Sequence, residues 1–217
     1  MTRKANRAGF QIRKYGTYRR MPWRNGRGVT LEIAREPAAG DRFAWRLSLA
    51  DIDRSGEFSA YPGYRRALVL IAGKGLRLRF RGHGACFLDP ARRAARFEGD
   101  WKTHCAIPAG PCTDLSLIVR KDPAARPATV VRAPRMVRMK STGRVALARG
   151  LYGALFIIEG SVAVAESTRA RSRTARDRDT VLFLPGPERT VRLRSLGTSA
   201  PQLALLRWRP GKPGAKR

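Results

Sequence analysis

The chain has 217 residues, of which 43% are hydrophobic and 28% charged, a globular composition large enough to bury a core and unlike that of a disordered protein. Its 45 Lys and Arg against 16 acidic residues give a formal net charge of +29. The chain has no apolar run of the ~18–20 residues that span a membrane, and no apolar segment follows its basic N-terminus, so we expect neither membrane association nor secretion. Its three cysteines have no spacing typical of disulfide or metal sites. We therefore expect free thiols in the cytoplasm.

Along the chain, short apolar or alternating runs separated by Gly, Pro and Asp predict strands and almost no helix. In the run from Phe43 to Ala50, alternation places Phe43 and Trp45 on one face, and Arg46 and Ser48 on the other. The other predicted strands are Thr30–Ile33, Ala67–Ile71, Leu76–Phe80, Leu115–Val119, Ala154–Ile158, Val162–Ala165, Val181–Leu184, Val191–Leu193 and Leu203–Trp208.

Three segments are predicted to lie outside the strands. Residues 1–14 and 210–217 are basic and are expected to be disordered tails. The segment Glu166–Asp179 is rich in Ser, Thr and Arg, which is typical of an exposed loop. A hinge between two halves is expected near Lys121–Pro134.

The two halves of the chain repeat one pattern at a nearly constant spacing. Ala67–Gly73 aligns with Ala154–Gly160, and Leu115–Ile118 aligns with Leu203–Leu206. Each half contains a strand, a tight Gly turn, a second strand, a long connection and a last strand. This order predicts an all-β protein in which a small jelly-roll barrel is used twice.

Jelly-roll barrels of this length are often cupins, whose metal centre usually takes three His and a Glu. The sequence contains two His, His83 and His104, so a three-His site is impossible. The cysteines form no C-x-x-C pair, and no G-x-S-x-G motif is present. We therefore expect no metal or other cofactor, and we assign no catalytic residue.

A set of polar side chains recurs inside the apolar framework of the predicted first barrel. If its strands line one barrel, Arg24, Arg46 and Arg66 converge, and guanidinium groups bind small carboxylates through paired hydrogen bonds. Glu32 and Asp114 would balance the buried positive charge and support the arginines. Alternatively, Glu32 and Arg46 form only a cross-strand pair on a solvated face. The candidate ligand-binding residues are Trp23, Arg24, Asn25, Thr30, Glu32, Arg46, Ser48, Ser59, Arg66 and Asp114.

Several of these residues belong to longer motifs that resemble the HutD/Ves family, and the likeness spans residues 15–209. Ser116 stands where this family often has Asn after an Asp-Leu pair. The motifs are Pro22-Trp23-Arg24-Asn25-Gly26-x-Gly28-x-Thr30-x-Glu32-Ile33, Trp45-Arg46-x-Ser48-x-Ala50, Gly56-x-Phe58-Ser59-x-Tyr61-Pro62-Gly63-x-x-Arg66, Phe97-x-Gly99-Asp100 and Gly110-Pro111-x-x-Asp114-Leu115-x-Leu117.

The resemblance implies a bicupin, two jelly-roll (double-stranded β-helix) barrels in one chain, with a metal-free ligand pocket in the first. HutD-type members are associated with histidine utilisation, for which binding of formyl-glutamate or a similar small acid and a regulatory role have been proposed. Ves-type members are linked to environmental stress. The resemblance supplies no reaction.

We therefore expect a first cupin barrel over residues 15–125, which holds the pocket, and a mainly structural second barrel over residues 126–209. The favoured function is metal-free binding of a small carboxylate, such as a formyl or acyl amino acid linked to histidine utilisation, in a regulatory or accessory role. One alternative is a metal-independent isomerase or hydrolase with Glu32 or Asp114 as general base. A second is a basic nucleic-acid-associated protein, although the scattered charge argues against specific base recognition. The expected assembly is a monomer or a homodimer.

Overall fold

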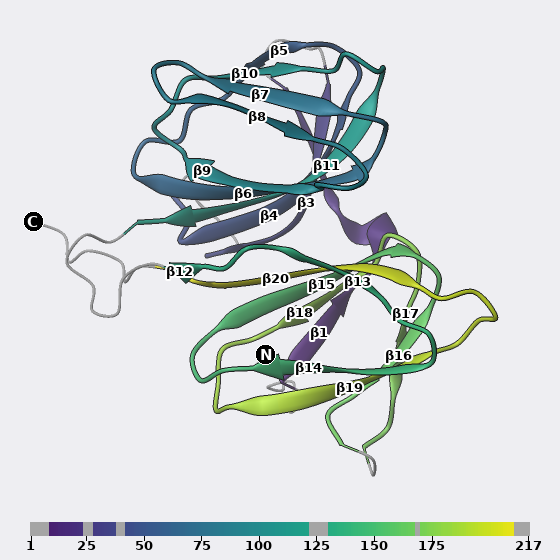
Figure 1. Ribbon diagram of the computed structural model, residues 1–217. Coiled ribbons are helices and arrows are strands. Elements are labelled where there is room, and N and C mark those ends of the chain that lie inside the picture. Colours follow the sequence, from purple (N-terminus) through teal and green to yellow (C-terminus); the bar gives the residue numbers. More distant parts are fainter. Residues whose placement is uncertain (1–8, 24–27, 38–41, 122–129, 168–169, 211–217) are drawn as a thin grey trace, which may run out of the picture. The chain divides into compact units, whose positions relative to one another are not determined.

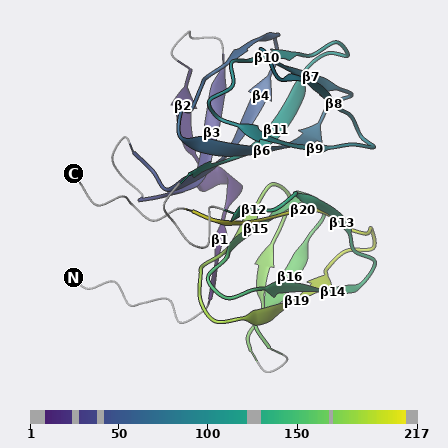
Figure 2. The same cartoon turned by 60° about the vertical axis from the view of Figure 1, so that its left-hand side comes forward.

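The computed structural model describes residues 9–23, 28–37, 42–121, 130–167 and 170–210 (Figure 1). Within these ranges all regular structure is β-strand, except for the single 3-10 turn η1 (Tyr15–Thr17). No helix in the described part is long and apolar enough to cross a membrane. The all-β prediction is confirmed, and the chain divides into two compact units, each made of two facing sheets (Figures 1 and 2).

The first barrel comprises residues 17–134 with the end of the chain from Trp208. One sheet has the order β2-β3-β4-β11-β6-β9, and the second has the order β5-β10-β7-β8. Its strands are β2 (Arg19–Pro22), β3 (Val29–Glu36), β4 (Trp45–Ile52), β5 (Gly56–Phe58), β6 (Tyr64–Ala72), β7 (Leu76–Phe80), β8 (Gly84–Leu88), β9 (Ala94–Glu98), β10 (Thr103–Ala106), β11 (Cys112–Arg120) and β12 (Val130–Val131), the last pairing with Trp208 and Arg209.

The second barrel comprises residues 135–207 together with residues 1–16. In one sheet the strands run β1-β18-β15-β20, with β13 also pairing with β20, and in the other they run β14-β19-β16-β17. The strands are β1 (Phe10–Arg13), β13 (Arg135–Arg138), β14 (Thr142–Leu147), β15 (Tyr152–Glu159), β16 (Val162–Ala165), β17 (Arg173–Ala175), β18 (Thr180–Phe183), β19 (Arg189–Ser195) and β20 (Gln202–Arg209).

The predicted repeat is visible in the strand order. The sequence β11-β6-β9 in one barrel corresponds to β20-β15-β18 in the other, and β5-β10-β7-β8 corresponds to β14-β19-β16-β17. The equivalent hairpins β6–β7 and β15–β16 both turn at a glycine with positive φ, 101° at Gly73 and 91° at Gly160. Such a φ disfavours other residues, which explains why the repeat keeps glycine at this point.

The sequence-based boundaries differ from the structure at three places. The predicted disordered tail is wrong for Phe10–Arg13, because these residues form β1, which pairs with β18 in the second barrel. The units meet at residues 16/17 and 134/135, later than the predicted 14/15 and 125/126. The predicted loop Glu166–Asp179 contains strand β17. Residues 1–8, 122–129 and 211–217 lie outside the described residues.

The core of the first barrel lies between its two sheets and defines an inner face for each. Leu68 and Leu70 of β6 pack in one cluster with Leu76 and Leu78 of β7 and Cys105 of β10. Because alternate residues of a strand point to opposite faces, even-numbered positions of β6 face into the barrel. This parity also places Arg66 on the inner face.

Candidate binding site

Strand register brings six polar side chains together on the inner face of the six-stranded sheet. Directly opposite residues of antiparallel strands share a face. Ser116 lies opposite the core residue Leu68 and also opposite Ser48, which lies opposite Glu32. The same pairing places Asp114 beside Leu70, and Arg46 and Arg66 on either side of Ile118. We call Glu32, Arg46, Ser48, Arg66, Asp114 and Ser116 the inner polar cluster.

The two arginines of this cluster converge on the ring of Tyr61. Arg46 Nη2 donates to the Tyr61 hydroxyl over 2.6 Å, and its guanidinium carbon lies 5.1 Å from the ring centroid. The guanidinium carbon of Arg66 lies 5.6 Å from the same centroid. Two like charges held against one ring make a local centre of positive potential, which favours an anion between them.

Arg66 itself is 7% exposed and is held among aromatic rings. Its guanidinium carbon lies 5.2 Å from the centroid of Phe58 and 5.0 Å from that of Phe97. Its Nη1 donates to the main-chain oxygen of Ser59 over 3.2 Å. These contacts fix the guanidinium plane, and its Nε has no hydrogen-bond acceptor among the described residues.

The ionisation of Arg66 and Asp114 is coupled. Burial lowers the pKa of Arg66, and the nearby Asp114 charge offsets part of this effect. Burial raises the pKa of Asp114 to about 7, although Arg66 favours its charged form, and Asp51 adds a smaller repulsive contribution. The carboxyl group of Asp114 therefore changes its charge near neutral pH, next to a buried cation.

Five polar atoms of the inner polar cluster are buried without a hydrogen-bond partner among the described residues: Glu32 Oε2, Arg46 Nε, Arg66 Nε, Asp114 Oδ1 and Ser116 Oγ. Buried polar atoms are nearly always paired, since an unsatisfied one costs about 1–3 kcal/mol. These five atoms include hydrogen-bond donors and acceptors on one face. They could therefore be satisfied by water molecules or by a ligand that carries both donors and acceptors.

Glu32 takes a different partner from the predicted one. Its Oε1 accepts from Arg19, with Nη2 at 3.0 Å and Nε at 3.2 Å, and Arg35 Nη1 lies 3.9 Å from Oε2. Glu32 lies opposite Ser48, and the β-bulge that follows, between Glu32 and Ala34, brings Arg35 opposite Arg46. The alternative of a Glu32–Arg46 cross-strand pair is therefore wrong, and the arginines that Glu32 contacts are Arg19 and Arg35. The Glu32 carboxylate is 6% exposed, which excludes a solvated face.

Thr30 lies on the same face as the inner polar cluster, since it faces Ala50, which also lies opposite Asp114, and its side chain binds Trp23 at the β2–β3 hairpin. Trp23 Nε1 donates to the Thr30 hydroxyl over 2.9 Å, and Trp23 N donates to the Gly28 oxygen over 2.9 Å. A side chain at Gly28 would lie 2.8 Å from the Trp23 ring, which explains the glycine in this motif. The predicted residues Arg24 and Asn25 lie outside the described residues. Ser59 is exposed, and the contact it makes with Arg66 is through its main-chain oxygen.

Sequence reasoning missed four residues that build the site: Phe43, Tyr61, Arg35 and Ser116. Phe43 was expected on the Trp45 face, but β4 begins at Trp45. The guanidinium carbons of Arg46 and Arg35 lie 5.1 Å and 5.4 Å from the Phe43 ring centroid. Tyr61 and Ser116 lie within the motifs that resemble the HutD/Ves family, but the sequence did not indicate that they belong to the site. Their part in the site depends on the fold of the β5–β6 connection and on the register of β11.

A metal site finds no support in the described residues. They contain no group of three His, Cys, Asp or Glu side chains placed to hold an ion. The imidazole of His83 stacks on Trp101 at 4.4 Å between centroids. Cys86, Cys105 and Cys112 are free thiols, and burial raises the pKa of Cys112 to about 11, so this thiol stays protonated near neutral pH.

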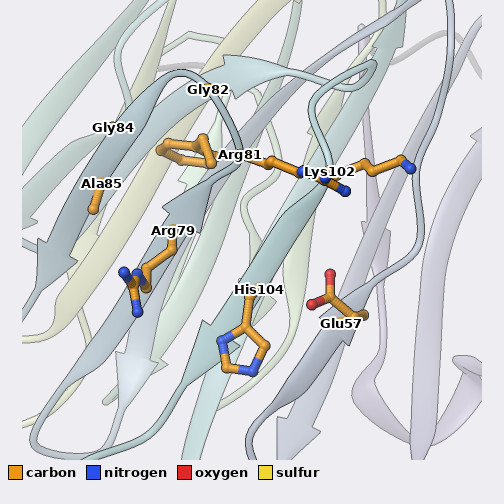
Figure 3. A pocket seen from close by; sticks show the side chains of 9 residues that line it. Glu57, Arg79, Arg81, Gly82, Gly84, Ala85, Lys102 and His104 are labelled. Carbon is orange, nitrogen blue, oxygen red and sulfur yellow. The ribbon is translucent and has the colours of Figure 1, made fainter.

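A second feature of the first barrel lies on the outer face of the four-stranded sheet, away from the inner polar cluster. Arg79, Arg81, Lys102 and His104 line a hollow of about 900 Å³, and Figure 3 shows these side chains from close by. Glu57, on the neighbouring strand, lies opposite His104. None of the predicted ligand-binding residues lines this hollow.

Comparison with known proteins identifies the family. The model of the HutD family matches residues 15–200. The chain belongs to the HutD family. A protein of Pseudomonas putida described as an uncharacterized 21.2 kDa protein in the hutC 3' region is 41% identical over 110 residues, which cover 50% of this chain and 57% of that protein. Protein Ves of Citrobacter koseri is 36% identical over 115 residues, 50% of this chain and 59% of its own length. The matches thus span little more than half of these curated relatives.

Solved structures extend the likeness over almost the whole chain. A conserved protein of unknown function from Pseudomonas aeruginosa PAO1 superposes with a TM-score of 0.77 at 31% identity, covering 91% of this chain and 97% of that one. HutD from Pseudomonas fluorescens SBW25 has a TM-score of 0.72 at 25% identity, covering 93% and 99%. The bicupin fold expected for a HutD protein is therefore confirmed.

Proposed function

We propose that this HutD family protein binds a small carboxylate at the inner polar cluster of its first barrel. The observation that carries the proposal is the convergence of Arg46 and Arg66 on Tyr61 with both Nε atoms buried and unpartnered. Each guanidinium already donates through one Nη nitrogen, to the Tyr61 hydroxyl or to the Ser59 oxygen. The free Nε edges and the Ser116 hydroxyl would hold the carboxylate oxygens.

The ligand we favour is a formyl or acyl amino acid linked to histidine utilisation, recognised in a regulatory or accessory role. Phe58, Tyr61 and Phe97 supply apolar walls around Arg66, which suits a short acyl chain. The relative from Pseudomonas putida lies in a hutC 3' region, and the structure of HutD from Pseudomonas fluorescens was determined in a formate condition. Formate and N-formyl-glutamate are therefore the probes of choice.

Calorimetry and thermal unfolding with formate, acetate and N-formyl-glutamate test this function. We expect at least one acid to raise the melting temperature, because a ligand at 100 times its Kd stabilises the folded state by about 2.7 kcal/mol. The Arg46→Gln variant should bind at least about tenfold more weakly, since losing one member of a buried charged hydrogen bond costs about 2–5 kcal/mol.

The matched control is Arg65→Gln, which removes one arginine of β6 that is next to Arg66 in the sequence but is exposed and pairs with Glu98. This variant should keep the affinity of the unmodified protein. Equal affinities of the Arg46→Gln variant and the unmodified protein, or no response to any acid, would show that the inner polar cluster is not a carboxylate site.

Carboxylate binding should also depend on pH with a defined sign. Asp114 has a pKa raised to about 7 and lies near Arg66. A bound carboxylate adds a second negative charge there, so it binds better when Asp114 is protonated. We expect the affinity to fall as the pH rises through about 7, with uptake of protons measured by calorimetry in buffers of different ionisation enthalpy. In Asp114→Asn the affinity should stay constant across this range.

Asp114 also favours a second candidate, a metal-independent hydrolase. A carboxylate with a pKa near 7 lies in the range where a general base is effective. Release of formate from N-formyl-glutamate, followed by proton NMR and lost in Asp114→Asn, would establish this activity. Intact N-formyl-glutamate after prolonged incubation, together with measurable binding, would leave the binding function alone.

A further inference from the structure

Three arginines gather on the second barrel, on the outer face of the β14-β19-β16-β17 sheet. Arg144 of β14 lies directly opposite Arg192 of β19, and Arg194 follows two residues later on the same face. All three are exposed, and they line a hollow of about 520 Å³. We call Arg144, Arg192 and Arg194 the arginine face.

In the part of the chain that the structure describes, no acidic side chain pairs with the arginine face. None of its three side chains makes a hydrogen bond or an ion pair with a residue that the structure describes. Like charges directly opposite on neighbouring strands repel each other and are destabilising. Such an arrangement is relieved when an anion lies between the guanidinium groups.

Four of the five acidic residues of the second barrel have partners elsewhere, and the fifth, Glu188, is exposed just before β19. Lys14 Nζ pairs with Asp179 at 2.8 Å, and Gln202 Nε2 donates to Glu159 over 3.2 Å. Glu166 and Asp177 accept from the main-chain nitrogens of Gly9 and Gly160. These carboxylates stabilise turns and strand ends and leave the positive charge of the arginine face exposed.

The surroundings of the arginine face suit an extended chain better than a small molecule. Ala163 and Ala165 of β16, opposite Arg194 and Arg192, form a floor of small side chains. Thr142, Ser167 and Ser172 supply hydroxyl groups at the rim, and none of the described residues that line the hollow is aromatic. The equivalent face of the first barrel is also basic, but Glu57 lies among its cations (Figure 3).

We propose that the arginine face binds the sugar–phosphate backbone of a nucleic acid without reading its sequence. Arginine forks contact phosphate oxygens, hydroxyl groups add neutral hydrogen bonds, and the net charge of +29 attracts a polyanion over a distance. The described residues that line the hollow include no aromatic or amide side chain, so bases are neither stacked nor read at their edges. This site is independent of the inner polar cluster, because it lies in the other barrel.

The test is fluorescence anisotropy with a labelled oligonucleotide of mixed sequence, single- and double-stranded, at salt concentrations from about 50 to 200 mM. The triple variant Arg144→Gln, Arg192→Gln, Arg194→Gln should bind at least about tenfold more weakly at the lowest salt. Its plot of log K against log salt should be shallower by roughly 2–3, since each of the three lost phosphate contacts contributes about 0.9 to the slope on double strands and about 0.7 on single strands. Changing the oligonucleotide sequence should have little effect.

The matched control removes the same charge from the same barrel at the exposed positions Arg135→Gln, Arg138→Gln and Lys140→Gln. This control should keep most of the affinity and the salt slope. Equal losses in both triple variants would mean that diffuse charge is responsible and would overturn the proposal. Displacement of the oligonucleotide by low-millimolar inorganic phosphate at constant ionic strength, or binding to anionic vesicles but not to the oligonucleotide, would overturn it as well.

Discussion

The Asp114→Asn variant is expected to gain stability over the unmodified protein as the pH rises. Burial raises the pKa of Asp114 to about 7, well above the ordinary value of about 3.9 in an unfolded chain. Between these two values the folded protein holds a proton that the unfolded chain has released, so the free energy of unfolding falls with rising pH. Each pKa unit corresponds to about 1.36 kcal/mol, which gives roughly 2–3 kcal/mol between pH 5 and pH 8.

Asparagine resembles the protonated acid in shape and does not titrate, so the variant should lose this part of the pH dependence. Urea unfolding followed by tryptophan fluorescence reports on the unfolding of the first barrel, which contains Asp114, because all four tryptophans belong to that barrel. Asp53→Asn, at an exposed position just after β4, should leave the pH dependence unchanged. A constant difference in unfolding free energy between Asp114→Asn and the unmodified protein from pH 5 to pH 8 would contradict this account.

The alternation of β4 and the repeat were enough to predict much of the fold and part of the site. Trp45 is 2% exposed and packs against Trp208 at 5.0 Å, while Arg46 faces the inner polar cluster. The repeat correctly predicted two barrels, because the same hairpin with its glycine turn occurs in both. These features follow from local periodicity, which a sequence displays directly.

The contacts that could not be predicted from the sequence are those that depend on strand register and on pairing between distant segments. Glu32 lies opposite Arg19 of β2 and pairs with it, while the bulge after Glu32 brings Arg35 opposite Arg46. Nothing in the alternation marks where one residue is added. Tyr61 lies in a connection between strands, so its contact with Arg46 arises only when that connection folds. The arginine face could not be predicted either, because Arg144 and Arg192 are far apart in the sequence and only the register of β14 and β19 brings them together.

Strand β1 is the clearest case of distant pairing. Its four residues follow a basic segment and show little periodicity of their own, yet they pair with β18 at the other end of the chain. Arg189 Nη2 and Leu184 N both donate to the Gly9 oxygen, over 2.8 Å and 3.1 Å. This attachment makes the beginning of the chain a structural part of the second barrel.

Replacing Phe10 by alanine should therefore destabilise the second barrel by about 3–5 kcal/mol, the usual cost of removing a buried phenylalanine. Phe10 is 2% exposed and packs edge to face against Phe183 at 6.3 Å within the barrel core. Native-state hydrogen exchange should show faster exchange in β15 and β18, while β6 and β11 of the first barrel stay protected. Gln11→Ala, half-exposed on the opposite side of β1, should change exchange by less than about 0.5 kcal/mol. Equal effects of the two substitutions would show that β1 is held by its main chain alone and that Phe10 contributes little to the core.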